Sequence, residues 1–169
     1  DYFQAVVEAN SSSVYGYTLK SLTKINGNQD FSKLTASASS ELIESSSSHL
    51  ATNAIDGNLK TAWVEDANGV GRNEWIKLEN KDGSPITVCA IEFALGYQRS
   101  EDHFAGNGTP TKVLIETDSG FKMTTELGGE YTDCVILGEE EQTKWIKVTI
   151  LDAHAGTMFE DTCISEISL

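Results

Sequence analysis

Residues 56–61 hold the most suggestive group of oxygen ligands in this chain. Asp56, Asn58 and Thr61 surround Gly57 within this short segment. Calcium takes six to eight oxygen ligands, and a tight loop can supply a carboxylate, a hydroxyl and several carbonyl oxygens. The same residues could instead form an Asp-Gly turn, in which the carboxylate and the hydroxyl satisfy backbone N–H groups. The sequence leaves a cation site and a hydrogen-bonded turn both open.

A second group of polar and aromatic side chains falls in predicted loops or at predicted strand ends. A neutral glycan is recognised by carboxylate and amide acceptors, a few donors and an aromatic platform in a shallow groove. Taken singly, such residues are more typical of a solvated surface or, at residues 106–108, of a turn. Together, the residues that supply the glycan-binding set are Glu65, Glu74, Trp75, Tyr97, Arg99, Phe104 and Asn107.

The sequence carries no motif of a nucleophilic or metal-dependent enzyme. The serines at 45–48 lack a Gly-x-Ser-x-Gly elbow, and the three histidines show no metal-ligand spacing. Spacing alone leaves Glu65 and Glu74 open as a pair of glycosidase carboxylates, because their separation in space is not readable from the sequence. Because no motif of an enzyme is present, we predict a protein that is not an enzyme.

The charge and length of the chain exclude two classes of partner. The 169 residues include 12 basic and 26 acidic ones, which gives a formal net charge of −14. Neutralising phosphates requires clustered Lys and Arg, which are scattered here, so we expect no nucleic-acid partner. No apolar run approaches the ~20 residues of a membrane span, so we expect no direct membrane insertion.

From residue 74 onward, apolar and polar residues alternate with the period of β-strands. Residues 87–95 predict a long strand whose apolar face is formed by Thr87, Cys89, Ile91, Phe93 and Leu95. Residues 118–120 (Asp-Ser-Gly) are a turn signal between two such runs and predict a hairpin. No segment has a convincing helical period, and short strands separated by turns indicate an all-β sandwich.

Residues 1–30 differ in character from the rest of the chain. Residues 14–19 could form a strand, and the flanking residues 10–13 and 26–28 are typical of turns. We predict a leader or an added hairpin over residues 1–30, and the β-sandwich over residues 31–169.

The cysteines and tryptophans are interpreted as strand residues. Cys89, Cys134 and Cys163 lack the spacing of a zinc site, and we expect three small buried residues on strands. Large aromatic residues in strands usually fill the core, which we expect for Trp63 and Trp145. For Trp75, the core and a sugar-stacking platform both stay open.

Several segments resemble one known superfamily. Residues 53–63 (NAIDGNLKTAW) resemble the A-x-DG-x-x-x-T-x-W segment of discoidin domains, also called coagulation factor 5/8 type C domains. Residues 61–65 and 69–76 are similar to a bacterial branch of that superfamily, the NADase-type glycan-binding domains. Residues 96–97, 104–115 and 161–167 resemble the same branch.

The resemblance implies a fold, a function and a location. The fold is a jelly-roll β-sandwich of the galactose-binding-like type. The function is non-catalytic binding of a glycan or glycoprotein by loops at one end of the sandwich, where the seven residues of the glycan-binding set would lie. The location is extracellular or on a bacterial cell surface, within a larger parent protein. The alternative is a protein–protein interaction or translocation module that uses the same loops and has no glycan ligand.

The resemblance also implies one structural calcium ion. In discoidin-like folds the loop that corresponds to residues 56–61 often holds this ion, and a Glu from the last strand completes its ligands. The residues in these places are Asp56, Asn58, Thr61 and Glu166.

Overall fold

The protein is described by a computed structural model over residues 3–9, 11–12, 17–24, 30–128 and 130–169. The short helical elements are η1 (Phe31–Lys33), η2 (Ala51–Ile55) and α1 (Glu101–Gly106). The strands are β1 (Phe3–Ala9), β2 (Tyr17–Lys24), β3 (Leu34–Ala38), β4 (Leu42–Ile43), β5 (Ser48–His49), β6 (Trp63–Val64), β7 (Trp75–Asn80), β8 (Ile86–Leu95), β9 (Thr109–Thr117), β10 (Lys122–Glu126), β11 (Thr132–Thr143), β12 (Trp145–His154) and β13 (Cys163–Ser168). The all-β prediction is confirmed. Within the described ranges, no helix is long and apolar enough to cross a bilayer.

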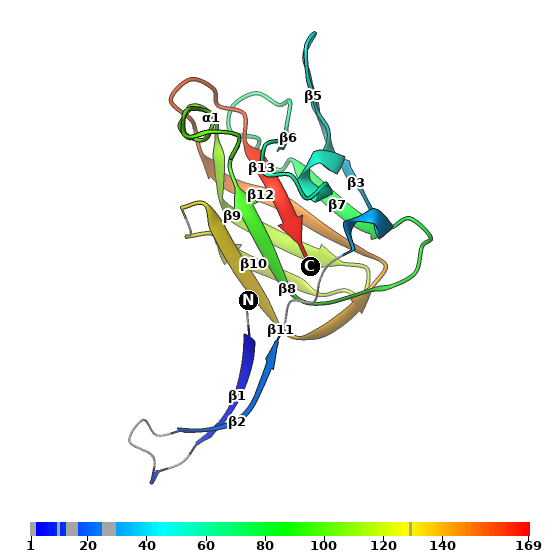
Figure 1. The fold of residues 1–169 in the computed structure, drawn as a ribbon, viewed down its shortest axis with the longest axis vertical. Helices are drawn as coiled ribbons and strands as arrows, with labels where there is room; N and C mark the ends of the chain where they lie inside the picture. The colour runs from blue at the N-terminus through cyan, green and yellow to red at the C-terminus, as the bar shows by residue number, and fades with distance from the viewer. Residues whose placement is uncertain (1–2, 10, 13–16, 25–29, 129) are drawn as a thin grey trace.

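Two antiparallel sheets form the sandwich (Figure 1). One sheet has five strands in the order β10-β9-β12-β7-β3, and the other has four in the order β11-β8-β13-β6. The turn predicted at residues 118–120 does join β9 to β10, which pair from Glu116–Lys122 to Lys112–Glu126. The jelly-roll β-sandwich predicted from the sequence is therefore present.

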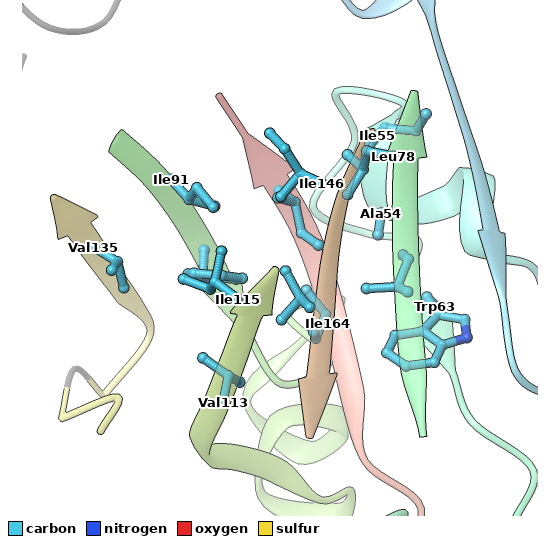
Figure 2. Packing of buried hydrophobic residues seen from close by; sticks show 14 of the residues in the cluster. Ala54, Ile55, Trp63, Leu78, Ile91, Val113, Ile115, Val135, Ile146 and Ile164 are labelled. Carbon is cyan, nitrogen blue, oxygen red and sulfur yellow. The ribbon is translucent and has the colours of Figure 1, made fainter. Parts of the chain in front are cut away.

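The core lies between the two sheets (Figure 2). On β12, Ile146, Val148 and Ile150 are fully buried, and the residues between them are only half-buried. Trp63 of β6 is also fully buried, as predicted, and its indole N–H donates to the carbonyl oxygen of Ser40 at 2.9 Å. Burying a large apolar side chain contributes about 1.5–3 kcal/mol, so this layer is the main source of stability.

Strand β8 does not keep the alternation that the sequence predicts. Ile86 and Val88 are buried, Thr87 is exposed and Cys89 is half-buried, whereas Ile91 and the alternate residues after it face the core. The pairing with β11 shifts here, because Val88 lies opposite Glu141 while Ala90 lies opposite Ile136. The residues of β11 between these pairs form a bulge, which changes the phase of the strand. Placing Thr87 and Cys89 on the core face was therefore wrong.

The three cysteines, all of which lie in the described part of the chain, form no disulfide. Cys163 is fully buried, as expected, whereas Cys89 and Cys134 are only half-buried, which corrects the expectation for these two. Burial raises the pKa of all three thiols and keeps them protonated at neutral pH.

Two of the three tryptophans lie outside the core. Trp145 precedes the buried Ile146 by one residue and therefore points to the outer face of its sheet, where it is half-buried. Its assignment to the core was wrong, because the buried residues of β12 are the even-numbered ones from Ile146 to Ile150, and Trp145 lies on the other face of the strand. Trp75 of β7 is half-buried in the same way, next to the buried Ile76.

Strands β1 and β2 form a separate antiparallel hairpin, paired from Phe3–Lys24 to Ala9–Tyr17. In Figure 1 it extends from the end of the sandwich opposite α1. Residues 14–16 of the predicted strand and the turn predicted at residues 26–28 lie outside the described residues. The division into units at residues 1–30 and 31–169 stays a prediction.

Candidate ligand-binding site

A cavity of about 350 Å³ opens at the end of the sandwich that carries α1, β5 and β6 (Figure 1). Its walls come from the β4–β5 hairpin, β6, the segment after β8, α1 with its C-cap, and the loop before β13. The lining residues are Leu42, Glu44, Ser47, His49, Val64, Tyr97, Arg99, His103, Asn107, Phe159 and Asp161.

Tyr97 forms the centre of this wall. Its ring lies edge-on against His49 at 5.6 Å and against His103 at 5.2 Å, both measured between ring centroids. Gly96, directly before it, has φ of 66°, and a Cβ there would lie 2.7 Å from the Phe104 ring. Only glycine allows this sharp turn at the end of β8, so Gly96 fixes where Tyr97 enters the cavity.

The two histidines are held by short polar contacts. Ser100 is the N-cap of α1, and its hydroxyl oxygen lies 2.7 Å from Nδ1 of His103. Nε2 of His49 lies 3.3 Å from the Ser47 hydroxyl and 3.5 Å from a carboxylate oxygen of Glu44. These contacts set the orientation of both imidazole rings, which gives the cavity fixed polar edges.

Arg99 and Asn107 provide donors at the mouth of the cavity. Arg99 is exposed and forms no ion pair with any residue that the structure describes. The Asn107 amide donates to the carbonyl oxygen of His103 at 2.8 Å and is thereby anchored to α1. An unpaired guanidinium and an anchored amide are suited to bind ligand oxygens.

The loop before β13 adds an aromatic ring and a carboxylate. Phe159 is 50% exposed, and its backbone N–H donates to the carbonyl oxygen of Gly106 at 2.9 Å, which holds the loop against α1. Burial raises the pKa of Asp161, and the nearby carboxylates of Asp66, Glu160 and Glu44 add to this effect. The cavity therefore combines an open aromatic face with mixed donors and acceptors.

Three of the seven predicted glycan-binding residues line this cavity: Tyr97, Arg99 and Asn107. Phe104 lies beside it, where its ring packs on Tyr131 at 4.4 Å and borders a second hollow. Glu74 accepts hydrogen bonds from the hydroxyls of Ser39 and Ser40, and neither it nor Trp75 lines the cavity.

Glu65 is fully buried and cannot contact a ligand in this structure. Its Oε1 accepts a hydrogen bond from the Thr162 N–H at 2.8 Å, and its Oε2 accepts one from the Ala67 N–H at 2.7 Å. The pKa of Glu65 is raised, mainly because the carboxyl group is buried. Placing Glu65 among the ligand-binding residues is therefore corrected: its carboxyl group joins two loops beneath the site.

Comparison with known proteins assigns the chain to a family. Residues 28–169 match the family described as "NAD glycohydrolase translocation F5/8 type C domain". The chain belongs to this family. No curated protein matches it significantly.

Solved structures of carbohydrate-binding modules share the fold of this F5/8 type C domain. The family 32 module from Clostridium perfringens NanJ, in complex with galactose, is 24% identical at a TM-score of 0.60, over 81% of this chain and 93% of that one. A family 32 module from a C. perfringens family 31 glycoside hydrolase is 20% identical at 0.61, over 82% and 91%. A chitosan-binding module from Paenibacillus sp. IK-5 is 20% identical at 0.55, over 80% and 92%.

Among the cavity residues of the F5/8 type C domain that were not predicted from the sequence are five charged, imidazole or aromatic ones. They come from three separate segments and show no common spacing: Glu44, His49, His103, Phe159 and Asp161. The only sequence signal was the coincidence of histidines and aromatics in loops, which is common on any surface. In the sequence the two histidines stand far apart, and only the fold brings them to either side of Tyr97.

The four predicted calcium ligands do lie together. Asp56 accepts hydrogen bonds from the Asn58 N–H and the Thr61 hydroxyl, both at 2.8 Å, as in the turn interpretation. Glu166 reaches this loop from β13, where its Oε2 accepts from the Gly57 N–H at 2.8 Å. Its Oε1 is buried with no hydrogen-bond partner among the residues that the structure describes. The described residues contain no metal-binding group of three or more His, Cys, Asp or Glu side chains.

Proposed function

We propose that this F5/8 type C domain is a non-catalytic carbohydrate-binding module that takes a glycan into the cavity at the α1 end of the sandwich. The observation that carries the proposal is the composition of the cavity wall. An open aromatic ring, fixed imidazoles, an exposed guanidinium and two carboxylates converge there.

Each group has a role that suits a sugar. Phe159 can stack on the apolar C–H face of a pyranose ring, because half of its surface is open. Arg99 and the histidines can donate to sugar hydroxyls, while Glu44 and Asp161 can accept from them. This pattern of one apolar contact with a few polar groups is typical of ligand pockets.

A binding role agrees with the positions of the two carboxylates that could have formed a glycosidase pair. Both oxygens of Glu65 accept backbone hydrogen bonds in the interior, and Glu74 is bonded to serine hydroxyls. Neither lines the cavity. We further propose that the domain is part of a larger bacterial protein that is secreted or displayed at the cell surface.

Calorimetric titration with a panel of saccharides tests this proposal. We expect at least one saccharide to bind with a Kd between about 1 μM and 1 mM, the range of about 4 to 8 kcal/mol. Arg99→Ala and Phe159→Ala should each weaken binding about tenfold, the effect of losing one charge-assisted hydrogen bond or one aromatic contact. Thr87→Ala, on an exposed position of β8, is the matched control and should leave affinity unchanged.

A second candidate function follows from the description of the family. Its name links the domain to translocation of an NAD glycohydrolase, so the same loops could bind a partner polypeptide. In that case pull-down would recover a protein that Arg99→Ala and Phe159→Ala fail to bind, and the saccharide panel would show no binding. Saccharide binding that is lost in both variants would exclude this second function for the cavity.

We also propose that the loop at residues 56–61 and Glu166 hold one calcium ion. Oε1 of Glu166 has no hydrogen-bond partner among the described residues and lies next to the Asp56 loop. This oxygen would serve there as a ligand of the calcium ion. Burial raises the pKa of Glu166 to about 7, and the nearby carboxylate of Asp56 contributes. A cation stabilises the charged form of two carboxylates that lie close together, above all when one of them is buried. A bound calcium ion would have this effect on Asp56 and Glu166.

A further inference from the structure

The cavity at the α1 end of the sandwich carries more negative than positive charge. Its acidic lining residues are Glu44 and Asp161, and its lining residue with a permanent positive charge is Arg99. No lysine of the described part of the chain lines this cavity. Two more carboxylates, those of Asp66 and Glu160, are close enough to raise the pKa of Asp161. The cavity region therefore holds four acidic groups and one arginine.

Asp161 is the cavity carboxylate whose negative charge is least compensated. Burial raises its pKa most, and the negative charges of Asp66, Glu160 and Glu44 raise it further. The hydrogen bonds that oppose this effect include one from its own backbone N–H. The ion pairs among the described residues do not include Asp161. A positive charge brought by a ligand would stabilise the ionised form of this carboxylate.

Backbone hydrogen bonds hold Asp161 in place at the cavity wall. Its carbonyl oxygen accepts from the Gly108 N–H at 2.9 Å, and a Cβ at Gly108 would lie only 2.8 Å from this oxygen. The next residue, Thr162, donates its N–H to the buried carboxyl group of Glu65 at 2.8 Å. Because both neighbouring segments are tied down, a ligand that binds Asp161 orders little additional backbone.

The second cavity carboxylate comes from a separate segment. Glu44 lies directly after β4, where its Oε2 accepts a hydrogen bond from the Ser47 hydroxyl at 2.8 Å and lies 3.5 Å from Nε2 of His49. Its charge also acts on Asp161. Two carboxylates from opposite parts of the sequence therefore act on the same space.

The open aromatic ring lies in the same loop as Asp161. Phe159 precedes Asp161 by two residues, and both side chains line the cavity. A pyranose stacked on Phe159 would therefore bring its ring substituents near a carboxylate. An ammonium substituent supplies three donors and a positive charge, whereas a hydroxyl supplies one donor and no charge.

The charge of the whole molecule favours the same class of ligand. The formal net charge is −14, and a field of this sign attracts cations and repels polyanions. A cationic sugar would therefore be attracted both by the field of the protein and by the carboxylates of the cavity.

We propose that the ligand of this cavity is a sugar with a free ammonium group, such as a glucosamine or galactosamine unit that is not acetylated. The ammonium group donates to Asp161, Glu44 adds a second negative charge, and the pyranose ring stacks on Phe159. This inference rests on the function proposed for the cavity and narrows it from saccharides in general to amino sugars.

Calorimetric titration with two matched sets of methyl glycosides tests the inference. One set is glucose, glucosamine and N-acetylglucosamine, and the other is the corresponding galactose set. The measurement is made at about pH 7, where an amine that titrates like an α-amino group, near ~7.7–8.0, is mostly protonated. In at least one set, we expect the amino sugar to bind about tenfold more tightly than the other two members, the effect of a charge-assisted hydrogen bond. Added salt should reduce this preference.

Variants of single residues assign the preference to the cavity. Asp161→Asn keeps the shape of the side chain and removes its charge, so the ratio of the affinities for the amino sugar and its parent sugar should fall to near one. Phe159→Ala should weaken all members of a set alike, because each of them has the pyranose ring. Melting curves would confirm that each variant is folded.

Asp82→Asn is the matched control for the loss of one negative charge. Asp82 lies in the exposed turn before β8, whereas the cavity residue Tyr97 lies after the other end of that strand. The Asp82 carboxylate accepts from the Ser84 N–H at 2.9 Å, and an asparagine oxygen can accept the same bond. This variant should leave the preference for the amino sugar unchanged.

Four outcomes would overturn the inference while leaving a saccharide-binding cavity in place or replacing it. Equal affinity for the amino sugar and its parent would do so, as would a preference that persists in folded Asp161→Asn. Binding of cadaverine as tight as that of the amino sugar would indicate a cation site that does not recognise the sugar ring. Tighter binding of a lysine-rich peptide would assign the cavity to a protein partner. If no member of either set and no saccharide of the wider panel binds, the function proposed for the cavity fails as well.

Discussion

Glu65 accepts a hydrogen bond from the backbone N–H of Thr162 at 2.8 Å, across 97 residues of sequence. The bond joins the end of β6 to the segment before β13. Because that segment carries Phe159 and Asp161, the buried carboxyl group of Glu65 supports one wall of the cavity without touching it. A residue that looked like a ligand-binding group is therefore a structural one.

The first prediction concerns the space around Glu65. Gly69 and Gly71 both have positive φ, so alanine at either position is strained by about 1–2 kcal/mol. A Cβ at Gly71 would also overlap the Glu65 carboxyl group, whereas a Cβ at Gly69 would meet nothing within 4 Å. We expect Gly71→Ala to lower the free energy of unfolding by about 1–3 kcal/mol more than Gly69→Ala. Urea denaturation of the matched pair measures this difference, and equal losses would contradict it.

The second prediction concerns pH. The pKa of Glu166 is raised from 4.5 to about 7 in the folded state, mainly by burial. Between these values the native state holds a proton that the unfolded state has released, so the free energy of unfolding falls as pH rises through this window. At about 1.36 kcal/mol per pKa unit, the loss reaches about 3 kcal/mol.

Glu166→Gln isolates this effect from those of Glu65 and Asp161, whose pKa values are also raised. In calcium-free buffer the variant should be more stable than the parent at pH 8 and similar to it at pH 4. Parallel stability profiles for the two proteins between pH 4.5 and 7 would show that Glu166 is not the group responsible.

The third prediction concerns calcium. An ion that binds only the folded state stabilises it by about 2.7 kcal/mol at 100-fold excess over Kd. Adding calcium should therefore raise the Tm, and a chelator should lower it again. Asp56→Ala should abolish the response, because the loop loses its carboxylate. Melting curves that chelator and calcium leave unmoved would favour the turn interpretation, in which Asp56 simply bonds to Asn58 and Thr61.

The fourth prediction concerns the thiols. Cys163 is fully buried, so it should react with a thiol reagent only after unfolding. Cys89 and Cys134 are half-buried and should react in the folded state, more slowly than a free thiol because their pKa values are raised. Mass spectrometry of peptides from timed labelling would resolve the three sites. Labelling of Cys163 at the rate of Cys134 would contradict the difference in their burial.

Local patterns in the sequence were sufficient to predict the class of fold and several of its secondary-structure elements. The Asp-Ser-Gly turn at residues 118–120 placed the β9–β10 hairpin, and the two-residue alternation from residue 74 onward indicated that this part of the chain is built of strands. These properties depend on residues next to each other in the chain, namely on turn chemistry and on the two-residue period of a strand. The motif around Asp56 likewise pointed to the family, to which the chain belongs.

The tertiary structure alone decided which residues face the core in β8 and which ones form the site. The phase of β8 changes because β11 bulges opposite Cys89, and no feature of β8 itself signals this. The cavity brings together His49, Tyr97 and Phe159 from distant segments. The role of Glu65 depends on one backbone donor, the Thr162 N–H, that lies 97 residues away in the sequence. Burial, register and pKa are set by groups that only folding brings together, so the sequence could nominate these residues but could not assign their roles.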